Sequence, residues 1–454
     1  VVKCASLRVE PKIESKSGKM KIAIINKSDS TGGAAVVSFR LMEALRRAGE
    51  DARMVVVEKL SDSPFVIQAA SKRSAMVPFL EERLKIFIAN GFNRDTLFKI
   101  DTASDGLNLL SIPFVREADV IMLNWVNQGV LSLKGIGRLA KAGKRLIWTM
   151  HDTWCFTGIC HHSGECMRFE GVCDNCPLLK GAIDKKLAKH TQSRKRKLYS
   201  GAEIDFVAVS NWLAERGARS SLFEGKKPTV IPNAFHFDNE NDIKEIEVNK
   251  GSENREIKIL FGAARLDDAV KGLPILKEMT KILAEKYRSV ASRLRLLTFG
   301  EYKNPDALAG IAIPHTHLGR ISGKENLKNL YREGDIVVSS SLYETLPGTL
   351  VEGQVYGAIP VAFPRGGQGD IIDHLSTGYL APWSDDVKEA GKNLAEGIFW
   401  AYGVAKEPEK FNAICRRMYE SAFERFNEQA VAESYLDLIR NATTCCNMIN
   451  HDKT

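Results

Sequence analysis

The sequence contains no apolar run long enough to cross a membrane. No run approaches the ~18 residues that a spanning helix needs, and residues 1–19 lack the apolar centre of a secretory signal. We therefore expect a cytoplasmic protein. Short repeats and low-complexity tracts are also absent, and 44% hydrophobic and 26% charged residues are typical of a folded protein rather than a disordered one. A length of 454 residues allows two or three domains.

Neither sign of charge dominates, since the formal net charge is only +8. This excess suits anionic partners such as phosphates or lipid surfaces without favouring nucleic acid. The most basic run, Lys185–Lys197, has no interleaved aromatic residues on which bases could stack, so we expect no nucleic-acid partner. Such a run is usually the solvated face of a helix; the alternative is peripheral contact with an anionic membrane at the inner face of the plasma membrane. The apolar segment Ile86–Ile88 is interpreted as core rather than as a membrane-facing edge.

Short β-branched runs alternate with helical patterns along the chain. The expected strands are Lys21–Asn26, Arg53–Val57, Asp119–Leu123, Arg145–Met150, Asp205–Val209, Lys258–Phe261, Leu294–Phe299, Asp335–Ser339 and Ile359–Phe363. Helices are expected between them, for example at Ala34–Arg47, Leu273–Lys286 and Val387–Tyr402. This alternation predicts an α/β protein with two doubly wound domains, each a parallel sheet covered by helices on both faces.

A charged stretch that is poor in apolar residues, Asn239–Glu256, separates the two alternating series. It predicts a linker. The expected organisation is a leader, native or not, at 1–19, an N-terminal Rossmann-like domain at 20–238 with a Cys-rich insertion at 155–177, the linker at 239–256, a C-terminal Rossmann-like domain at 257–410, and C-terminal helices at 411–454.

Ligands of doubly wound sheets bind beyond the carboxyl ends of the strands, so the residues that follow the strands are the candidates for a binding site. After the first strand come Gly32 and Gly33, which offer flexible positions and free amides to an anion; a tight turn without a ligand is the plainer reading. The G-x-G-x-x-G fingerprint of dinucleotide-binding enzymes is not present at this turn, which disfavours a dehydrogenase.

The strongest local pattern is a strand-to-helix turn bracketed by Glu344 and Glu352. Pro347 suits the first turn of a helix, which leaves the amides of Gly348 and Thr349 free to bind a phosphate oxygen. Glu352, one turn further on, can accept both hydroxyl hydrogens of a ribose. Taken alone, two glutamates would be solvated helix charges.

Two cations follow the first strand of the same half of the chain. Arg265 and Lys271 can neutralise a diphosphate leaving group, and such stabilisation is often the largest catalytic contribution. No Asp-x-Asp pair ends a strand where it could chelate a metal-diphosphate, so we expect activity without a divalent cation.

These motifs resemble the retaining glycosyltransferases of family 4. The likeness covers nearly all of residues 20–440 and rests on Arg265…Lys271-Gly272 and Glu344-x7-Glu352, together with Gly32-Gly33, His151-Asp152, Ser210-Asn211-Trp212 and Pro232-Asn233 in the family's order. It implies the GT-B architecture, with two domains facing across a cleft and the last helices crossing back to the first domain. Within the family, the chain looks similar to bacterial enzymes of capsule, exopolysaccharide or O-antigen assembly, many of which carry a Cys-rich insertion after the His-Asp pair.

The resemblance implies transfer of a hexose from a nucleotide sugar, UDP- or GDP-linked, to a saccharide or lipid-linked acceptor with retention at the anomeric carbon. Arg265 and Lys271 would bind the donor diphosphate, Glu352 the ribose and Glu344 the sugar hydroxyls. The amides of Gly348 and Thr349 would bind the donor phosphate.

In the N-terminal domain, the resemblance implies that Gly32 and Gly33 let the backbone approach the donor phosphate and the acceptor, and that His151 hydrogen-bonds a hydroxyl of the reacting sugar. Asp152 and Trp154 are acceptor-side candidates. Ser210 is interpreted as a helix cap rather than a ligand contact.

The family likeness favours front-side displacement, in which the departing phosphate takes the acceptor proton, over a double displacement with Glu344 as nucleophile. Two other function classes stay open: a GT-B sugar-nucleotide epimerase, which uses the same donor without an acceptor, and a basic membrane- or polyanion-binding protein.

Five of the nine cysteines lie between Cys155 and Cys176, so they form a local cluster rather than a disulfide framework. Four of them are candidate ligands of a structural zinc: Cys160, Cys166, Cys173 and Cys176, with His161 or His162 as substitutes. Disulfides and free thiols are the alternatives. A fully coordinated zinc would have no open position for catalysis and would stiffen a loop.

Overall fold

The computed structural model describes residues 19–179, 181–237 and 255–451, the last ten of these by their backbone only. The predicted leader and linker therefore fall almost entirely outside the described residues. The chain divides into two units. The first is formed by the residues up to Ala234 together with those from Val431 onward, and the second by Phe235–Ala430.

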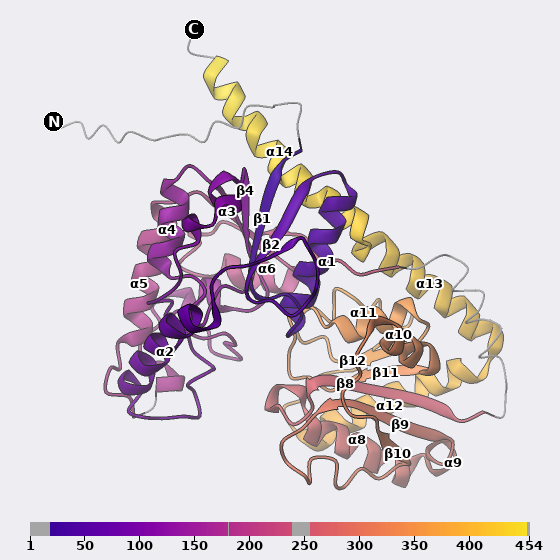
Figure 1. Cartoon of the computed structure of the whole chain (residues 1–454). Coiled ribbons are helices and arrows are strands. Elements are labelled where there is room, and N and C mark those ends of the chain that lie inside the picture. Colours follow the sequence, from indigo (N-terminus) through magenta and orange to yellow (C-terminus); the bar gives the residue numbers. More distant parts are fainter. Residues whose placement is uncertain (1–18, 180, 238–254, 452–454) are drawn as a thin grey trace. The chain divides into compact units, whose positions relative to one another are not determined.

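The first unit is built on a seven-stranded sheet in which every neighbouring pair is parallel, in the order β3-β2-β1-β4-β5-β6-β7. Figure 1 labels β2, β1 and β4 of this sheet. The strands are β1 (Lys21–Ser28), β2 (Asp51–Glu58), β3 (Val66–Gln68), β4 (Val120–Leu123), β5 (Arg145–Met150), β6 (Ile204–Ala208) and β7 (Thr229–Val230). β1 is interior, since Ile24 lies beside Met54 of β2 and Met122 of β4, and it is apolar because both faces of a parallel sheet are covered.

Helices connect these strands, as parallel neighbours require. They are α1 (Gly33–Arg47), α2 (Lys72–Ala89), α3 (Pro113–Glu117), α4 (Leu133–Lys141), α5 (Leu187–Ser200), α6 (Asn211–Ala218) and, at the other end of the chain, α14 (Glu428–His451). The buried side chains of α1, β1 and β2 share one core with five residues of α14: Val431, Ala432, Tyr435, Leu436 and Ile439. The Tyr435 hydroxyl also lies 2.8 Å from the Thr149 hydroxyl of β5.

The second unit repeats the plan with a six-stranded parallel sheet, in the order β10-β9-β8-β11-β12-β13. Its strands are β8 (Ile257–Arg265), β9 (Leu294–Glu301), β10 (His315–His317), β11 (Ile336–Ser339), β12 (Ile359–Ala362) and β13 (Tyr379–Leu380). Its helices are α8 (Leu273–Lys286), α9 (Arg288–Ala291), α10 (Lys324–Glu333), α11 (Gly348–Val355), α12 (Val387–Lys406) and α13 (Pro408–Phe426).

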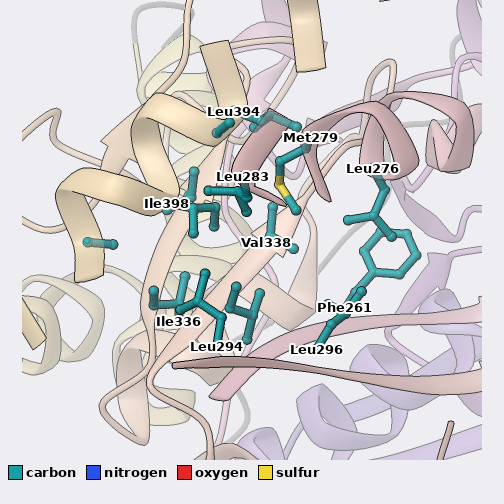
Figure 2. Close-up of a cluster of buried hydrophobic side chains, with 14 of the residues drawn as sticks. Phe261, Leu276, Met279, Leu283, Leu294, Leu296, Ile336, Val338, Leu394 and Ile398 are labelled. Atoms are coloured by element: carbon teal, nitrogen blue, oxygen red, sulfur yellow. The ribbon is translucent and has the colours of Figure 1, made fainter. Parts of the chain in front are cut away.

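The core of the second unit lies where α8 and α12 pack together over the sheet. Figure 2 shows Met279 and Leu283 of α8 beside Leu394 and Ile398 of α12, above Ile336 of the sheet. All five side chains are fully buried, and burying each one stabilises the fold by roughly 1.5–3 kcal/mol. The predicted pair of parallel-sheet α/β domains is confirmed.

In the described residues, no helix is long and apolar enough to span a membrane. The segments that follow β1, β4 and β5 in the first unit, and β8, β11 and β12 in the second, lie at the carboxyl ends of the strands. The predicted site residues come from these segments.

Candidate functional site

In the second unit, the predicted phosphate-binding turn is the start of α11. Pro347 is the cap residue and the helix begins at Gly348, one position later than a proline inside the first turn would require. The carbonyl of Pro347 accepts from the amide of Leu350, whereas no residue that the structure describes accepts from the amides of Gly348 and Thr349. Two amides and the positive end of the helix dipole are therefore available to an anion.

Lys271 and Glu344 form an ion pair next to this turn. Lys271 Nζ donates to Glu344 Oε1 over 2.5 Å, and the Ser341 hydroxyl donates to the same oxygen over 2.9 Å. Both charged side chains keep about a quarter of their surface exposed, 27% and 21%, so a ligand can reach them. The Ser340 hydroxyl donates to the carbonyl of Lys271, which ties the loop after β8 to the loop after β11.

The close approach of these two loops depends on Gly272. Its φ of 65° is left-handed, and a Cβ at this position would lie 1.9 Å from the Ser340 carbonyl oxygen. A second glycine contact lies on the other side of Glu344, where a Cβ on Gly366 would lie 2.0 Å from the Glu344 carbonyl oxygen. The Gly367 amide donates to that same carbonyl over 2.9 Å. The Glu344 amide also donates to the Arg365 carbonyl over 3.2 Å, so this segment holds the backbone of Glu344.

Arg265 ends β8 with its side chain half exposed, and its Nε donates to Asp267 over 3.0 Å. Asp267 also accepts from the amides of Lys303 and Asn304. Burial raises the pKa of Asp267, but these amide bonds and Arg265 outweigh it and hold the pKa below its ordinary value. The predicted cation is therefore present at the strand end, oriented by a carboxylate. Glu352 lies half-buried on α11, one turn after Gly348.

In the first unit, His151 follows β5 directly. Its Nε2 donates to Asn124 Oδ1 over 2.8 Å, and Asn124 follows the neighbouring strand β4. Burial lowers the pKa of His151 to about 4, although Asp152 acts in the opposite direction. The imidazole is therefore neutral at pH 7, with one ring nitrogen a donor and the other an acceptor.

Asp152 is the centre of a buried hydrogen-bond network. Its Oδ2 accepts from His161 Nδ1 over 2.7 Å and from Trp125 Nε1 over 3.1 Å, and its Oδ1 accepts from the Trp154 amide over 2.8 Å. Burial raises the pKa of Asp152, but attraction to His161 and the hydrogen bonds outweigh it and lower the pKa. Asp152 is an ionised, fully hydrogen-bonded carboxylate.

His161 lies between Asp152 and Asp101. Burial lowers its pKa, yet attraction to Asp152 and the interactions with Asp101 outweigh burial and raise the pKa to about 9. Asp101 is fully buried and also accepts from Arg83 Nη2 over 2.8 Å, next to the buried carboxyl of Glu82.

The glycines after β1 stand in open space. Gly32 caps α1 with a φ of 90°, which favours glycine, and a Cβ on Gly32 or Gly33 would meet no atom within 4 Å. The predicted helix cap at Ser210 is confirmed, because its side chain accepts from the Leu213 amide over 3.3 Å.

The cysteine cluster gathers as predicted, but not at metal-ligand geometry. Four thiols line one small cavity of about 20 Å³: Cys160, Cys166, Cys173 and Cys176. Thiols are suitable zinc ligands, yet nowhere in the described ranges do three His, Cys, Asp or Glu side chains stand where they could hold a metal ion together. All the cysteines with described side chains are free, and burial raises the pKa of Cys160 to about 12 and of Cys173 to about 11. Structural zinc stays a prediction, and so does the substitute role of His161, which does not line this cavity.

The basic run is only partly a solvated face. Lys195 of α5 is fully buried; its Nζ donates to the carbonyls of Trp154 and Thr157 over 2.5 and 3.1 Å, and burial lowers its pKa to about 8. The interpretation of the whole run as solvated is therefore wrong at this residue. The run includes the residue that fixes the loop after the His151-Asp152 pair.

Sequence reasoning missed Asn124, Trp125 and Asp101. Asn124 and Trp125 follow β4 directly, so the rule that ligand-binding residues follow strands would have found them. Asp101 follows no strand, and nothing local distinguishes it from a surface aspartate.

Comparison with known proteins adds a matching family model and a fold. Residues 242–398 match the family model described as glycosyl transferases group 1. The putative colanic acid biosynthesis glycosyl transferase WcaC of Escherichia coli K12 is 22% identical over 446 residues, which is 93% of this chain and 100% of WcaC.

Solved structures with the same fold include Anabaena Alr3699/HepE in complex with UDP-glucose, with a TM-score of 0.55, 15% identity and coverage of 93% of this chain and 100% of that one. Sucrose-phosphate synthase from Thermosynechococcus elongatus has a TM-score of 0.59 at 17% identity, covering 94% and 100%. These likenesses show that the fold is GT-B, as the motifs led us to expect.

Proposed function

We propose that the chain, whose residues 242–398 match the family model of glycosyl transferases group 1, transfers a hexose from a nucleotide-diphosphate sugar to a saccharide or lipid-linked acceptor. The transfer retains the anomeric configuration and needs no divalent cation. The product belongs to a cell-surface polysaccharide, a role supported by the name of the relative WcaC.

The observation that carries this proposal is the Lys271–Glu344 ion pair beside the start of α11. An ammonium group and the free amides of Gly348 and Thr349 provide an anion site suited to a diphosphate. Glu344, held next to the ammonium, provides acceptor oxygens for the hydroxyls of the sugar on that diphosphate. Cation and carboxylate together fit an activated sugar better than they fit either a simple phosphate or a simple saccharide.

The remaining candidate residues take the roles that the family resemblance implies. Arg265 exchanges part of its contact with Asp267 for the diphosphate, and Glu352 accepts from the ribose hydroxyls. His151 accepts from a sugar hydroxyl with the lone pair of its neutral ring, while Gly32 and Gly33 leave room for the donor phosphate and the acceptor.

A UDP-hexose is the first donor to test and a GDP-hexose the second, because the structural neighbour HepE is described in complex with UDP-glucose. Thermal-shift measurements with UDP-, GDP- and ADP-hexoses should show one stabilising donor, and Lys271→Ala should weaken its binding at least tenfold, about 1.4 kcal/mol. Lys281→Ala, which removes an exposed lysine of α8, is the matched control and should bind like the wild type.

A reaction assay distinguishes the proposed transferase from an epimerase. Incubation with donor alone should release nucleotide or leave the donor intact, whereas formation of an epimer would identify an epimerase. Excess chelator should leave the rate unchanged, and NMR of the product should show the donor's anomeric configuration. A sugar trapped covalently on Glu344 would replace front-side displacement by double displacement. Wild-type affinity in Lys271→Ala would refute the proposed donor site.

We further propose that the first unit contacts an anionic membrane through α2. This helix presents Met76, Leu80, Leu84 and Ile88 at intervals of four residues, so they share one face. Their exposed fractions lie between 45% and 58%. The core interpretation of Ile86–Ile88 is wrong for Ile88, although Ile86 is buried.

On α2 the charged side chains of Glu82 and Arg83 are buried, whereas the apolar stripe is exposed. Basic side chains flank the stripe. Lys72 and Arg73 are exposed at one end, and Lys185 and Lys186 lie near the other, where the Asp184 amide donates to the carbonyl of Ala89. An apolar stripe with flanking cations is the pattern that binds an anionic lipid surface.

Sedimentation with vesicles tests this contact. The chain should bind vesicles containing phosphatidylglycerol and not pure phosphatidylcholine, and Leu80→Glu/Leu84→Glu should abolish binding. Leu60→Glu alters an equally exposed leucine of the same unit outside the stripe and should bind normally. Binding that is independent of lipid charge, or unchanged in the double variant, would refute the α2 contact.

A further inference from the structure

The Cys-rich segment brings one side chain into the hydrogen-bond network that follows β5. His161 is buried, and its backbone is held on both sides: its amide donates to the carbonyl of Lys99, and its carbonyl accepts from the Thr153 amide over 3.0 Å. The neighbouring Cys160 pairs with Ile100 in an antiparallel bridge. The segment therefore lies between the chain around Asp101 and the chain that follows β5.

The ring of His161 is directed at Asp152. Its Nδ1–H donates to Asp152 Oδ2 over 2.7 Å, while its Nε2 stays 3.9 Å from Asp101, beyond hydrogen-bond distance. The ring also lies against the indole of Trp125, with centroids 5.5 Å apart. The cavity lined by the four candidate zinc ligands does not include His161. Its position is thus set by the Asp152 network and not by the thiols.

Both oxygens of Asp152 accept hydrogen bonds from inside the protein. Besides the bond from His161, it accepts from the Trp125 indole and from the Trp154 amide. A carboxylate with three donors inside the protein is suited to holding its neighbours in place. Asp152 holds the loop after β4 against the loop after β5.

These two loops are joined side chain by side chain. The consecutive residues Asn124 and Trp125 contact the consecutive residues His151 and Asp152: Asn124 with His151 over 2.8 Å, and Trp125 with Asp152 over 3.1 Å. A displacement of Asp152 would therefore move Trp125 and, through its neighbour Asn124, the acceptor that orients the His151 ring.

We propose that His161 is a positioning residue: its hydrogen bond fixes Asp152, and Asp152 and Trp125 in turn fix the Asn124–His151 pair for the transfer step. The role rests on the proposed function in one respect only, namely that His151 contacts the reacting sugar. This role of the Cys-rich segment requires no metal, because the fold of the segment places His161 at the end of β5.

The test compares three variants of the full chain. His161→Leu removes the donor. His161→Asn keeps an N–H near the place of Nδ1, and His315→Leu makes the same change at an exposed histidine of the second unit. With UDP-glucose as donor and nucleotide release as the measure, His161→Leu should lower kcat at least tenfold and leave KM for UDP-glucose within twofold. His161→Asn should recover at least a third of the wild-type kcat, and His315→Leu should retain all of it.

A second measurement does not depend on transfer. In protein labelled with ¹⁵N-tryptophan, the indole N–H resonance of Trp125, assigned with Trp125→Phe, should shift in His161→Leu and stay near its wild-type position in His161→Asn and His315→Leu. If His161→Leu does not fold, His161→Asn carries the test, since it should keep both the resonance and the activity. An unmoved Trp125 resonance in His161→Leu overturns the positioning role. So does a wild-type kcat in that variant, or a KM that rises in step with the loss of activity.

A wild-type chain that releases no nucleotide from any donor, while the Trp125 resonance shifts as described, would leave the network intact and refute the proposed function instead. The two failures are therefore distinguishable.

Discussion

Among single residues, the buried carboxyl of Glu82 should make the stability of the protein depend on pH. Burial and, after it, the nearby Asp101 raise its pKa from the ordinary 4.5 to about 8, although Arg83 acts in the opposite direction. The folded state therefore holds a proton that the unfolded state has lost. This stabilisation is complete below pH 4.5 and disappears as pH rises to about 8.

We expect Glu82→Gln to flatten this dependence. Relative to the wild type, the variant should gain on the order of a few kcal/mol in unfolding free energy between pH 5 and pH 8, as measured by urea titrations across that range. Glu81→Gln, one residue away and exposed, should follow the wild-type curve. Parallel curves for Glu82→Gln and the wild type would show that the carboxyl is ionised when buried.

Gly272 is the residue on which the donor half-site depends most. Gly272→Ala would place a methyl group against the Ser340 carbonyl, so we expect a loss of at least ~3 kcal/mol in unfolding free energy together with weaker donor binding. Gly310→Ala has a similarly left-handed φ of 86° in open space and should lose only about 1–2 kcal/mol. Equal losses in the two variants would show that backbone strain alone matters at Gly272.

For single residues, the sequence predicted those site residues whose pattern lies within a short segment. The residues Lys271, Glu344 and Gly348 form a pattern within short segments, and the structure brings all three to adjoining loops. The partners of Asp152 could not be foreseen, because Trp125 and His161 reach it from other segments and nothing in their own neighbourhood marks them. Long-range hydrogen bonds are set by the packing of the sheet, not by nearby sequence.

Among the helices, α5 is informative because Lys195, which belongs to its basic run, is fully buried. Lys195→Ala should remove the donor to the Trp154 and Thr157 carbonyls and leave a cavity, at a cost of about 3 kcal/mol in unfolding free energy. Lys197→Ala, two residues later and exposed, should change stability by less than about 0.5 kcal/mol. Chemical denaturation of both variants measures the difference, and equal stability would mean that the buried ammonium contributes nothing.

The long strands were predictable and the short ones were not. β1, β5 and β9 have the apolar runs of strands buried on both faces, and their predicted bounds agree with the structure within a few residues. β3, β7, β10 and β13 have two or three residues each, too few for any periodic pattern to appear. α2 escaped prediction because its apolar stripe faces away from the core, so the usual correspondence between apolar face and interior does not hold.

For the whole molecule, the two units have separate cores, one built around β1 and the other around β8. Nucleotide binding should therefore protect one unit selectively. With UDP-glucose at saturation, hydrogen exchange should slow in residues 262–272 and 344–352 and stay unchanged in residues 72–104, as measured by mass spectrometry. Protection confined to the first unit would place the donor elsewhere.

The participation of α14 in the first core has a consequence for biosynthesis. The amino-terminal sheet leaves the ribosome early, yet the side chains from Val431 to Ile439 that complete its interior are made last. The second unit is fully synthesised in between and can reach its final state while the first is still waiting. A nascent chain halted before α14 would thus have a complete second unit and a first unit whose apolar surface is uncovered. We expect chaperones to bind that surface until α14 has been synthesised.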